Sequence, residues 1–598
     1  MARLQILALL AWATNALHVS KRCPVFFKAP RQCDPIAPRS FLPDSVVTNV
    51  GSRIGQTANT TAFVHLLDAL DVIQSEFFVL EHGTWPDAID WTAAVVGTHF
   101  SGATRSVSED LVFLDSEEGV VGDWRQASNL IDGYFAQTVA YYFGQDAKAI
   151  RNQAYDDMLW VVLGWLESVK LVKGHGRRHY ADGVTSRQYH GELWVPVFSR
   201  RAREFWEYAM VGWDTRLCNG GMIWNPRLQP YKNAITNELF IAASISMYQH
   251  FASDARLTDQ RVAGSSPQDA MYLKAAVEGY RWLQASNMTN SQGLYIDGFH
   301  ISGYLDKENN NTKCDSRDEM VFTYNQGVIL TGQRGLWDVT GASSYLEDGH
   351  TLIQRVINAT GYNLTSDRPT DSVKKIKPGH LPKWHGLGRL GIMEEYCDAS
   401  ATCSADGQTF KGIFFHHLTT FCEPLDTPDN TAGFQIDERA FLAVQSSHAQ
   451  ACASYSGWLK HHAMAALKTR DDAGRFGQWW TAGLLIASNW TADDWPNLST
   501  DGIPRDSNAI DYRNYELPHD DVWAPKEPES KVASSLPVFT PESQTPIGAI
   551  GQRFIDHNFR GHNSTHQDPN RRGRGRTVET QSGGLALLRA YWKIAQAP

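Results

Sequence analysis

Segments with helical length and helical periodicity recur along most of this chain, and they constrain its fold more than any other feature. Within residues 153–172, apolar residues are spaced four, three, four and three apart, which places them on one helical face. Strand signals are sparse. We therefore predict a mainly α-helical fold with roughly eleven or twelve helices. The expected segments are residues 62–80, 127–143, 153–172, 234–251, 270–283, 324–339, 345–357, 412–421, 438–467, 476–488 and 580–594.

Several of these segments end in aromatic residues followed by a turn, as in A-Y-Y-F-G-Q-D and G-L-W-D-V-T-G. Such punctuation between successive helices favours stacked helical hairpins. Residues 365–387 are rich in Lys and Pro, and residues 497–576 are rich in Pro, Ser, Asp and Arg. Both stretches are predicted to be long surface insertions, because neither carries the core of a second domain.

The N-terminal sequence M-A-R-L-Q-I-L-A-L-L-A-W-A-T-N-A has a basic residue, a short apolar run and then small residues. This pattern predicts a cleaved signal peptide over residues 1–18. It is followed by an N-terminal extension, 19–50, and a single domain, 51–598. The chain offers no stretch of about twenty apolar residues to span a bilayer, and its end lacks the tail of a GPI signal.

Potential glycosylation sites and cysteines agree with export. Eight N-x-S/T sequons begin at Asn59, Asn287, Asn310, Asn358, Asn363, Asn489, Asn497 and Asn563. The eight cysteines include no C-x-x-C pair and are expected to form disulfides. Only five residues, D-A-S-A-T, separate Cys397 from Cys403, so we predict that these two are bonded. A secreted protein, with a place in the cell wall as an option, is expected.

The net charge of −10 argues against a nucleic-acid-binding protein, because such proteins are usually basic. One run, R-R-G-R-G-R from Arg571 to Arg576, is an exception. It could bind nucleic acid, but in an acidic exported chain a solvated loop is favoured. No nucleic-acid partner is expected, nor insertion into a membrane.

Common motifs for cofactors and metals are absent or unconvincing. The G-L-G-R-L-G stretch from Gly386 to Gly391 matches a dinucleotide fingerprint formally, but it follows a Pro/Lys/Trp loop rather than a strand. The pairs His416–His417 and His461–His462 lie in helical segments, where neighbours point to different faces. We interpret them as hydrogen-bonded polar positions and expect neither a metal nor a cofactor.

The stretch A-Y-D-D-M-L-W places two carboxylates, Asp156 and Asp157, at the start of an apolar helix. Two ionised neighbours repel each other, and apolar surroundings strengthen that repulsion. A structural explanation exists, since acidic residues in the first turn of a helix face the positive end of its dipole. The pair alone therefore does not establish a catalytic site.

A second polar block, C-N-G-G-M-I-W-N-P-R-L-Q-P-Y-K-N-A-I-T-N, precedes another helix. Amides, a lysine and a tryptophan suit a neutral polyol, which needs oriented hydrogen bonds and an apolar platform. A capped helix with a structural turn explains the same composition equally well. The candidate binding residues are Trp224, Asn225, Lys232, Asn233 and Asn237 here, Asp297 in L-Y-I-D-G-F, and Tyr324, Asn325 and Gln326 in Y-N-Q-G.

These motifs together resemble glycoside hydrolase family 76, the α-1,6-mannanases and their fungal cell-wall relatives. The paired-aspartate helix start, the glycine–tryptophan and lysine–asparagine block and Y-N-Q-G occur in the family's order. E-E-Y-C with F-K-G-I-F, G-Q-W-W and E-T-Q-S-G-G-L-A follow them. The resemblance extends over about residues 127–588. The two insertions depart from the family pattern and could alter which glycan fits.

The resemblance implies an (α/α)6 barrel that cleaves α-1,6-linked mannan with retention of configuration. It implies that Asp156 is the nucleophile and Asp157 the acid/base. Retaining glycosidases hold their two carboxyls about 5–5.5 Å apart, a separation that neighbours diverging by roughly 100° at a helix start can reach. Mutual repulsion would keep one of them protonated to higher pH, as a general acid requires.

Two other functions remain open on the sequence. A transglycosylase would move mannan-type or GPI-type glycan onto a wall acceptor, and a catalytically silent wall protein would only bind glycan. The intact aspartate pair speaks against the silent protein. Uronic-acid enzymes share the barrel, but no basic cluster suited to uronates is apparent. The expected partner is an α-mannan or another mannose-containing glycan, bound by a monomer.

Overall fold

The computed structural model describes residues 58–110, 124–180, 188–251, 267–426, 437–490, 503–504, 508–514 and 568–595. The predicted signal peptide, the extension 19–50 and most of the second insertion lie outside these ranges. The same holds for the sequons at Asn497 and Asn563.

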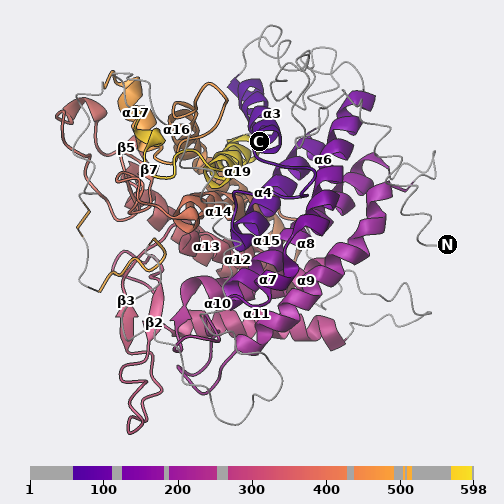
Figure 1. Ribbon diagram of the computed structural model, residues 1–598, viewed down its shortest axis with the longest axis vertical. Coiled ribbons are helices and arrows are strands. Elements are labelled where there is room, and N and C mark those ends of the chain that lie inside the picture. Colours follow the sequence, from indigo (N-terminus) through magenta and orange to yellow (C-terminus); the bar gives the residue numbers. More distant parts are fainter. Residues whose placement is uncertain are drawn as a thin grey trace, which may run out of the picture.

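Six of the described helices form a closed inner ring (Figure 1). Each contacts the next in chain order, and the last contacts the first. The ring closes because α19, at the end of the described chain, packs against both α14 and α4. The inner helices are α4 (Asp90–Glu109), α8 (Tyr155–His179), α10 (Ala234–His250), α12 (Val328–Thr340), α14 (Ala405–Phe421) and α19 (Val578–Ala595).

A second set of helices packs outside this ring, and inner and outer helices alternate along the chain. Helices α6, α9, α11 and α13 pack on α4, α8, α10 and α12 respectively, while α3 and α16 both pack on α19. This is an (α/α)6 barrel, which confirms the predicted fold class. The outer helices are α3 (Ala58–Ser75), α6 (Trp124–Gly144), α9 (Val195–Ala209), α11 (Pro267–Ala285), α13 (Ser344–Ala359) and α16 (Ser456–Leu467).

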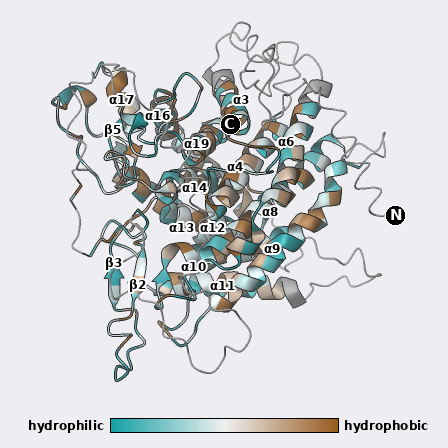
Figure 2. Cartoon of the chain, in the orientation of Figure 1, coloured by the Kyte–Doolittle hydropathy of each residue, from teal (hydrophilic) through white to brown (hydrophobic). Residues whose placement is uncertain are grey.

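Helices α4 and α9 were not among the segments expected from the sequence. Helix α4 is buried from Thr92 to Ser108, because outer helices and inner neighbours surround it. Its apolar residues between positions 93 and 107 are spaced three, four, three and four apart, so the sequence did contain the signal of this helix. Helix α9 also carries a stripe, which buries Phe198, Ala202 and Phe205 while polar residues face outward (Figure 2). Its omission was an error of interpretation. The segment 438–467 is two helices, α15 (Glu438–Ser454) and α16, which meet at Tyr455.

The described strands are short. Strands β1 (Lys232–Asn233), β2 (Gly298–His300) and β3 (Ser316–Asp318) form an antiparallel sheet, in which β1 leads into α10 and the other two strands follow α11. The G-L-G-R-L-G stretch forms a hairpin of β6 (Gly388–Arg389) and β7 (Ile392–Met393). It does not open a helix, so it lacks the geometry of a dinucleotide site. The remaining elements are α7 (Ala147–Ile150), α17 (Thr481–Ala487), the strand pair β4 (Tyr362–Asn363) and β5 (Arg368–Pro369), and 3₁₀ turns η1 (His190–Trp194), η2 (Met210–Gly212), η4 (Tyr324–Gln326), η5 (Val373–Lys375) and η10 (Pro569–Arg571).

Disulfides and exposed sequons agree with the expectations of the sequence. Cys397 is bonded to Cys403, which confirms the predicted pair. Two further bonds join Cys218 to Cys314 and Cys422 to Cys452. Five sequon asparagines are exposed, at Asn287, Asn310, Asn358, Asn363 and Asn489. Among the described helices, none is long and apolar enough to cross a membrane.

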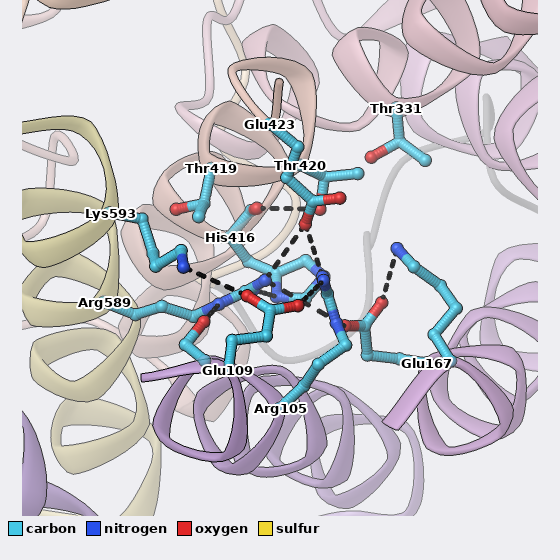
Figure 3. Close-up of polar contacts among 12 residues, drawn as sticks. Arg105, Glu109, Glu167, Thr331, His416, Thr419, Thr420, Glu423, Arg589 and Lys593 are labelled. Carbon is cyan, nitrogen blue, oxygen red and sulfur yellow. Dashed lines mark hydrogen bonds and ion pairs between the residues drawn. The ribbon is translucent and has the colours of Figure 1, made fainter. Parts of the chain in front are cut away.

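A buried network of charges joins the later turns of α4, α8, α14 and α19 (Figure 3). Arg105 pairs with Glu167 at 2.9 Å, with Glu109 at 3.0 Å and with Glu423. Arg589 donates to Nδ1 of His416 at 3.0 Å, which requires the neutral imidazole. Thr331 bonds His417 at 2.6 Å. Both histidines are thus hydrogen-bonded core residues, as interpreted from the sequence.

The arginine-rich run after residue 570 also makes contacts within the barrel. Arg572 donates to the carbonyl oxygen of Ala399 at 2.8 Å. Arg576, whose side chain is 6% exposed, pairs with Asp568 at 2.7 Å. These arginines join the chain before α19 to neighbouring loops, which differs from the solvated insertion expected there.

Candidate active site

The inner helices begin at the same end of the barrel, and their first turns meet there. Trp91, near the start of α4, donates its indole N–H to Asp406, near the start of α14, at 3.2 Å. Thr92 donates to Glu579, near the start of α19, at 3.2 Å. Helix N-termini carry partial positive charge, so this end of the barrel accommodates acidic groups.

Asp156 and Asp157 lie in the first turn of α8, at this end. Ala154 occupies the N-cap in extended conformation, and its N–H donates to Oδ2 of Asp157 at 3.0 Å. The N–H of Asp157 donates to Oδ1 of Asp156 at 3.2 Å. The structural explanation for the pair is therefore correct in part, because both carboxyls satisfy orphan donors of the helix.

The second oxygen of Asp156 faces away from its own helix. Trp224 donates its indole N–H to Oδ2 of Asp156 at 3.0 Å. Trp224 is fixed in turn by backbone bonds, since its carbonyl accepts from Tyr155 at 2.9 Å and its N–H donates to the carbonyl of Tyr231 at 2.8 Å. The glycine–tryptophan block and the aspartate pair, far apart in sequence, thus form one site.

The two carboxyls differ in acidity. Burial raises the pKa of Asp156 to about 6, against the opposing effects of Arg513 and of the hydrogen bonds it accepts. Burial and the neighbouring charge of Asp156 raise the pKa of Asp157 well above its usual range. Both carboxyls therefore hold their protons to higher pH than an exposed aspartate does, and an ionised Asp156 favours the protonated form of Asp157.

Other acidic residues surround the pair. Asp297 is buried and accepts from the Tyr231 hydroxyl at 2.7 Å. Burial and the charge of Asp297 raise the pKa of Asp318 to about 8. Burial raises the pKa of Asp406 to about 6. The cation Arg513 lies 3.5 Å from Asp297 and opposes this charge, and Arg574 also lowers the pKa of Asp406.

Three of the residues singled out as sugar-binding candidates line this arrangement. Trp224 holds Asp156, and Asp297 pairs with Arg513. Tyr324 is buried with its ring stacked on Phe410, at a centroid distance of 3.9 Å. A stacked aromatic beside carboxyls suits a sugar ring, which has apolar faces and polar edges.

Asn233 and Asn325 retain unused hydrogen-bonding capacity. Both are fully buried, and neither side-chain amide has a hydrogen-bond partner among the described residues. Each lies beside the site, Asn233 in β1 and Asn325 in the turn η4. A buried amide left unpaired is costly, so a polar ligand at these positions would stabilise them.

The other four candidates bond to the backbone instead. Lys232 donates to the carbonyls of Asp214 and Gly221, and Asn237 accepts from the Met222 N–H at 2.7 Å. The Gln326 amide bonds both the N–H and the carbonyl of Tyr295, at 2.8 and 2.9 Å. Asn225 accepts from the N–H of Arg227 in a turn, at 2.9 Å. These side chains shape the loops around the site.

Three residues of the site were not singled out from the sequence. Trp91 and Asp406 begin helices, and an acidic residue in the first turn of α14 was a usable signal. Arg513 carried no signal, because it lies in a stretch predicted to be a surface insertion. Of the described groups with metal-ligand chemistry, both include disulfide-bonded cysteines, which leaves neither with three free ligands.

The fold and the site together define an (α/α)6-barrel protein with paired carboxyls where its inner helices begin. The family model for glycosyl hydrolase family 76 matches residues 194–489. The chain belongs to this family. The aspartate pair precedes the matched range, and Arg513 follows it.

Curated relatives are distant. The chain is 24% identical over 296 residues to the mannan endo-1,6-alpha-mannosidase DCW1 of Candida glabrata, a match covering 48% of this chain and 47% of the relative. It is 22% identical over 342 residues to the mannan endo-1,6-alpha-mannosidase DFG5 of Saccharomyces cerevisiae, covering 54% and 59%. The matches therefore span about half the length of these relatives.

Two solved structures are similar at low identity. One is an inactive variant of the alpha-1,6-mannanase GH76A of Salegentibacter sp. HEL1_6 in complex with alpha-1,6-mannotetrose. It has 17% identity and a TM-score of 0.42, covering 73% of this chain and 94% of that one. The other is Dfg5 from Chaetomium thermophilum in complex with glucosamine, with 16% identity, a TM-score of 0.40, and coverage of 77% and 98%.

Proposed function

We propose that this protein is a secreted, retaining glycosidase that cleaves α-1,6-mannosidic linkages of mannan. The observation that carries the proposal is the pair Asp156 and Asp157, two neighbouring carboxyls with raised pKa values at the end of the barrel where the inner helices begin. The names of the family relatives support mannan as the substrate. The exposed sequons and the disulfides support export.

In the proposed mechanism, ionised Asp156 attacks the anomeric carbon while Asp157 gives its proton to the leaving oxygen. The glycosidic bond breaks as the bond from carbon to the Asp156 carboxylate forms. Asp157, now ionised, then removes a proton from water, which attacks the anomeric carbon and releases Asp156. Two inversions return the product to the α configuration.

The surrounding residues supply the binding surface in this proposal. The exposed part of Trp224 provides apolar area for the sugar ring. Trp224 has a second role, because its N–H stabilises the ionised Asp156.

Incubation with unbranched α-1,6-mannan tests the proposal. We expect new reducing ends, an α anomer as the first product by NMR, and no products from the variant Asp156→Asn/Asp157→Asn. An initial β anomer would refute the assignment of Asp156 as nucleophile. Binding of mannan without products would indicate a glycan-binding protein.

The same reaction decides between hydrolysis and transfer, because a sugar hydroxyl can replace water in the second step. Mannan is incubated with and without an added oligosaccharide acceptor, and products are resolved by mass. Products that carry the acceptor at the expense of reducing ends would identify a transglycosylase. Unchanged reducing ends support hydrolysis.

A further inference from the structure

Residues 508–514 cross the end of the barrel and are fixed at both ends. At one end, Glu319 donates its N–H to the carbonyl of Asn508 at 2.9 Å, and Ile510 donates its N–H to Asp318 at 3.0 Å. At the other, Ser404 donates its N–H to Asn514 at 2.8 Å and its hydroxyl to the carbonyl of Arg513 at 2.9 Å. We call this segment the strap.

The strap is attached to parts of the fold that are themselves rigid. Asp318 belongs to β3, and Ser404 is the N-cap of α14, where its hydroxyl accepts from the N–H of Gly407 at 3.2 Å. Asn514 is also held within the strap, since its amide donates to both oxygens of Asp511, at 2.8 and 3.0 Å. The backbone at Arg513 is therefore positioned by the barrel.

The side chain of Arg513 reaches from the strap to the aspartate pair. Its guanidinium lies over the ring of Trp224, with Cζ 4.7 Å from the centroid. That tryptophan donates its N–H to Asp156. The Arg513 side chain is 9% exposed and lies 3.5 Å from Asp297, and its Nε and Nη2 donate no hydrogen bond to any described residue.

We propose that Arg513 is a positioning residue for the catalytic pair: its guanidinium holds Trp224 against Asp156 and stabilises the ionised form of that carboxyl. The inference rests on the proposed function, since it presumes that Asp156 must be ionised to react. Arg513 is also the described cation within reach of both aspartates. The titratable groups facing it are Asp156 and Asp157 of α8, Asp297, Asp318, Asp406, Tyr231 and Tyr324.

The charge of Arg513 acts unequally on the two carboxyls. It is the largest influence lowering the pKa of Asp156, and in Asp157 it follows burial, the charge of Asp156, the hydrogen bond from Ala154 and the charge of Asp406. Arg513 thereby favours the ionised form of Asp156, the carboxyl that its neighbour Trp224 contacts. Without it, Asp156 would ionise at higher pH, and less of the enzyme would hold the reactive combination of one carboxylate and one acid.

The variant Arg513→Gln tests this role, with Arg513→Lys as the charge-preserving comparison and Arg203→Gln on the outer helix α9 as control. In Arg513→Gln we expect the apparent pKa of the acid limb of the kcat/KM profile to move to higher pH by about one unit. This is a typical effect of removing one nearby opposite charge. The alkaline limb should move less. The loss of activity should be about tenfold greater at pH 5 than at pH 8, and Arg513→Lys should restore most of the limb.

Two outcomes would overturn the proposal. A raised KM with unshifted limbs would mean that Arg513 only contacts substrate, and an equal loss at every pH would mean that it only supports the fold. The second measurement needs no substrate. In ¹³C-carboxyl-labelled protein, the signal that Asp156→Asn removes is titrated, and its pKa should be higher in Arg513→Gln. This shift tests Arg513 even if mannan is not cleaved, an outcome that would refute the proposed function alone.

Discussion

Replacing Asp157 by Asn removes its ability to donate a proton but keeps its structural role at the start of helix α8. The Asn oxygen can still accept the hydrogen bond from the N–H of Ala154, which Asp157 now accepts at 3.0 Å. The helix start is therefore preserved, and the side chain keeps its volume. What the substitution removes is the proton that the proposed mechanism gives to the leaving oxygen.

The size of the loss follows from the chemistry of the leaving group. General acid catalysis contributes about 10²–10⁴-fold, equivalent to roughly 3–5 kcal/mol of transition-state stabilisation. We expect this loss in kcat/KM on α-1,6-mannan. On an aryl mannoside with an acidic phenol the leaving oxygen needs no proton, so we expect the loss in the first step to fall to about tenfold or less.

The pH profile gives an independent test. In the wild type, activity should rise with pH as Asp156 ionises, near its pKa of about 6, and fall when Asp157 loses its proton. Asparagine does not titrate, so Asp157→Asn should keep the rising limb and lose the falling one. The assay is a set of initial rates from pH 4 to pH 10 on both substrates.

A matched control is Asp437→Asn, which changes an exposed aspartate at the start of the outer helix α15. It should leave both limbs and both rates unchanged. The reasoning is refuted if Asp157→Asn loses equally on mannan and on the aryl mannoside, or if its alkaline limb persists. Either result would mean that Asp157 serves only to begin a helix.

Three further outcomes are expected. Trp224→Phe removes the N–H that donates to Asp156 at 3.0 Å, so the acid limb should rise by about one pH unit while binding changes little; an unshifted limb contradicts this. Removing the Cys218–Cys314 bond, with a sequence separation of 96, should cost more in denaturant unfolding than removing Cys397–Cys403, with a separation of 6, at about 4.7 against 2.2 kcal/mol in the loop-entropy model. Nearby arginines lower the pKa of Glu423 to about 2, so its contribution of about 3 kcal/mol is present above pH 4.5 and is lost toward pH 2. Glu423→Gln should therefore reduce the loss of unfolding free energy between pH 4.5 and pH 2. A larger loss in the variant than in the wild type would contradict this prediction.

Features that depend only on residues close together in the sequence could be predicted from the sequence. The helix that begins at Tyr155 was evident from its apolar stripe, and the acidic pair in its first turn was evident from its position. Cys397 and Cys403 were predicted to bond because few residues separate them, and they do. Local spacing determines these features, and local spacing is written in the sequence.

The sequence did not show which of the polar candidate residues already have hydrogen-bond partners within the protein. Asn233 and Asn237 lie four residues apart near one helix start, yet the first is unpaired and the second is fully engaged with Met222 and the backbone. Lys232 bonds carbonyls contributed by a different loop. Composition identifies a group that can bind sugar, but only packing decides whether its hydrogen bonds are already used.

The barrel itself was suggested by helix number and confirmed by contacts between distant segments. Helix α4 was not predicted, although its apolar residues from Ala93 to Val107 repeat every three or four positions. The ring closes only when α19 meets α4, across almost the whole described chain. The sequence by itself determined most of the helices, the disulfide Cys397–Cys403 and the aspartate pair, because each depends on neighbouring residues. Only the tertiary structure decided that Trp224 and Arg513 meet Asp156, because nothing in the intervening chain encodes where a strap will cross the end of a barrel.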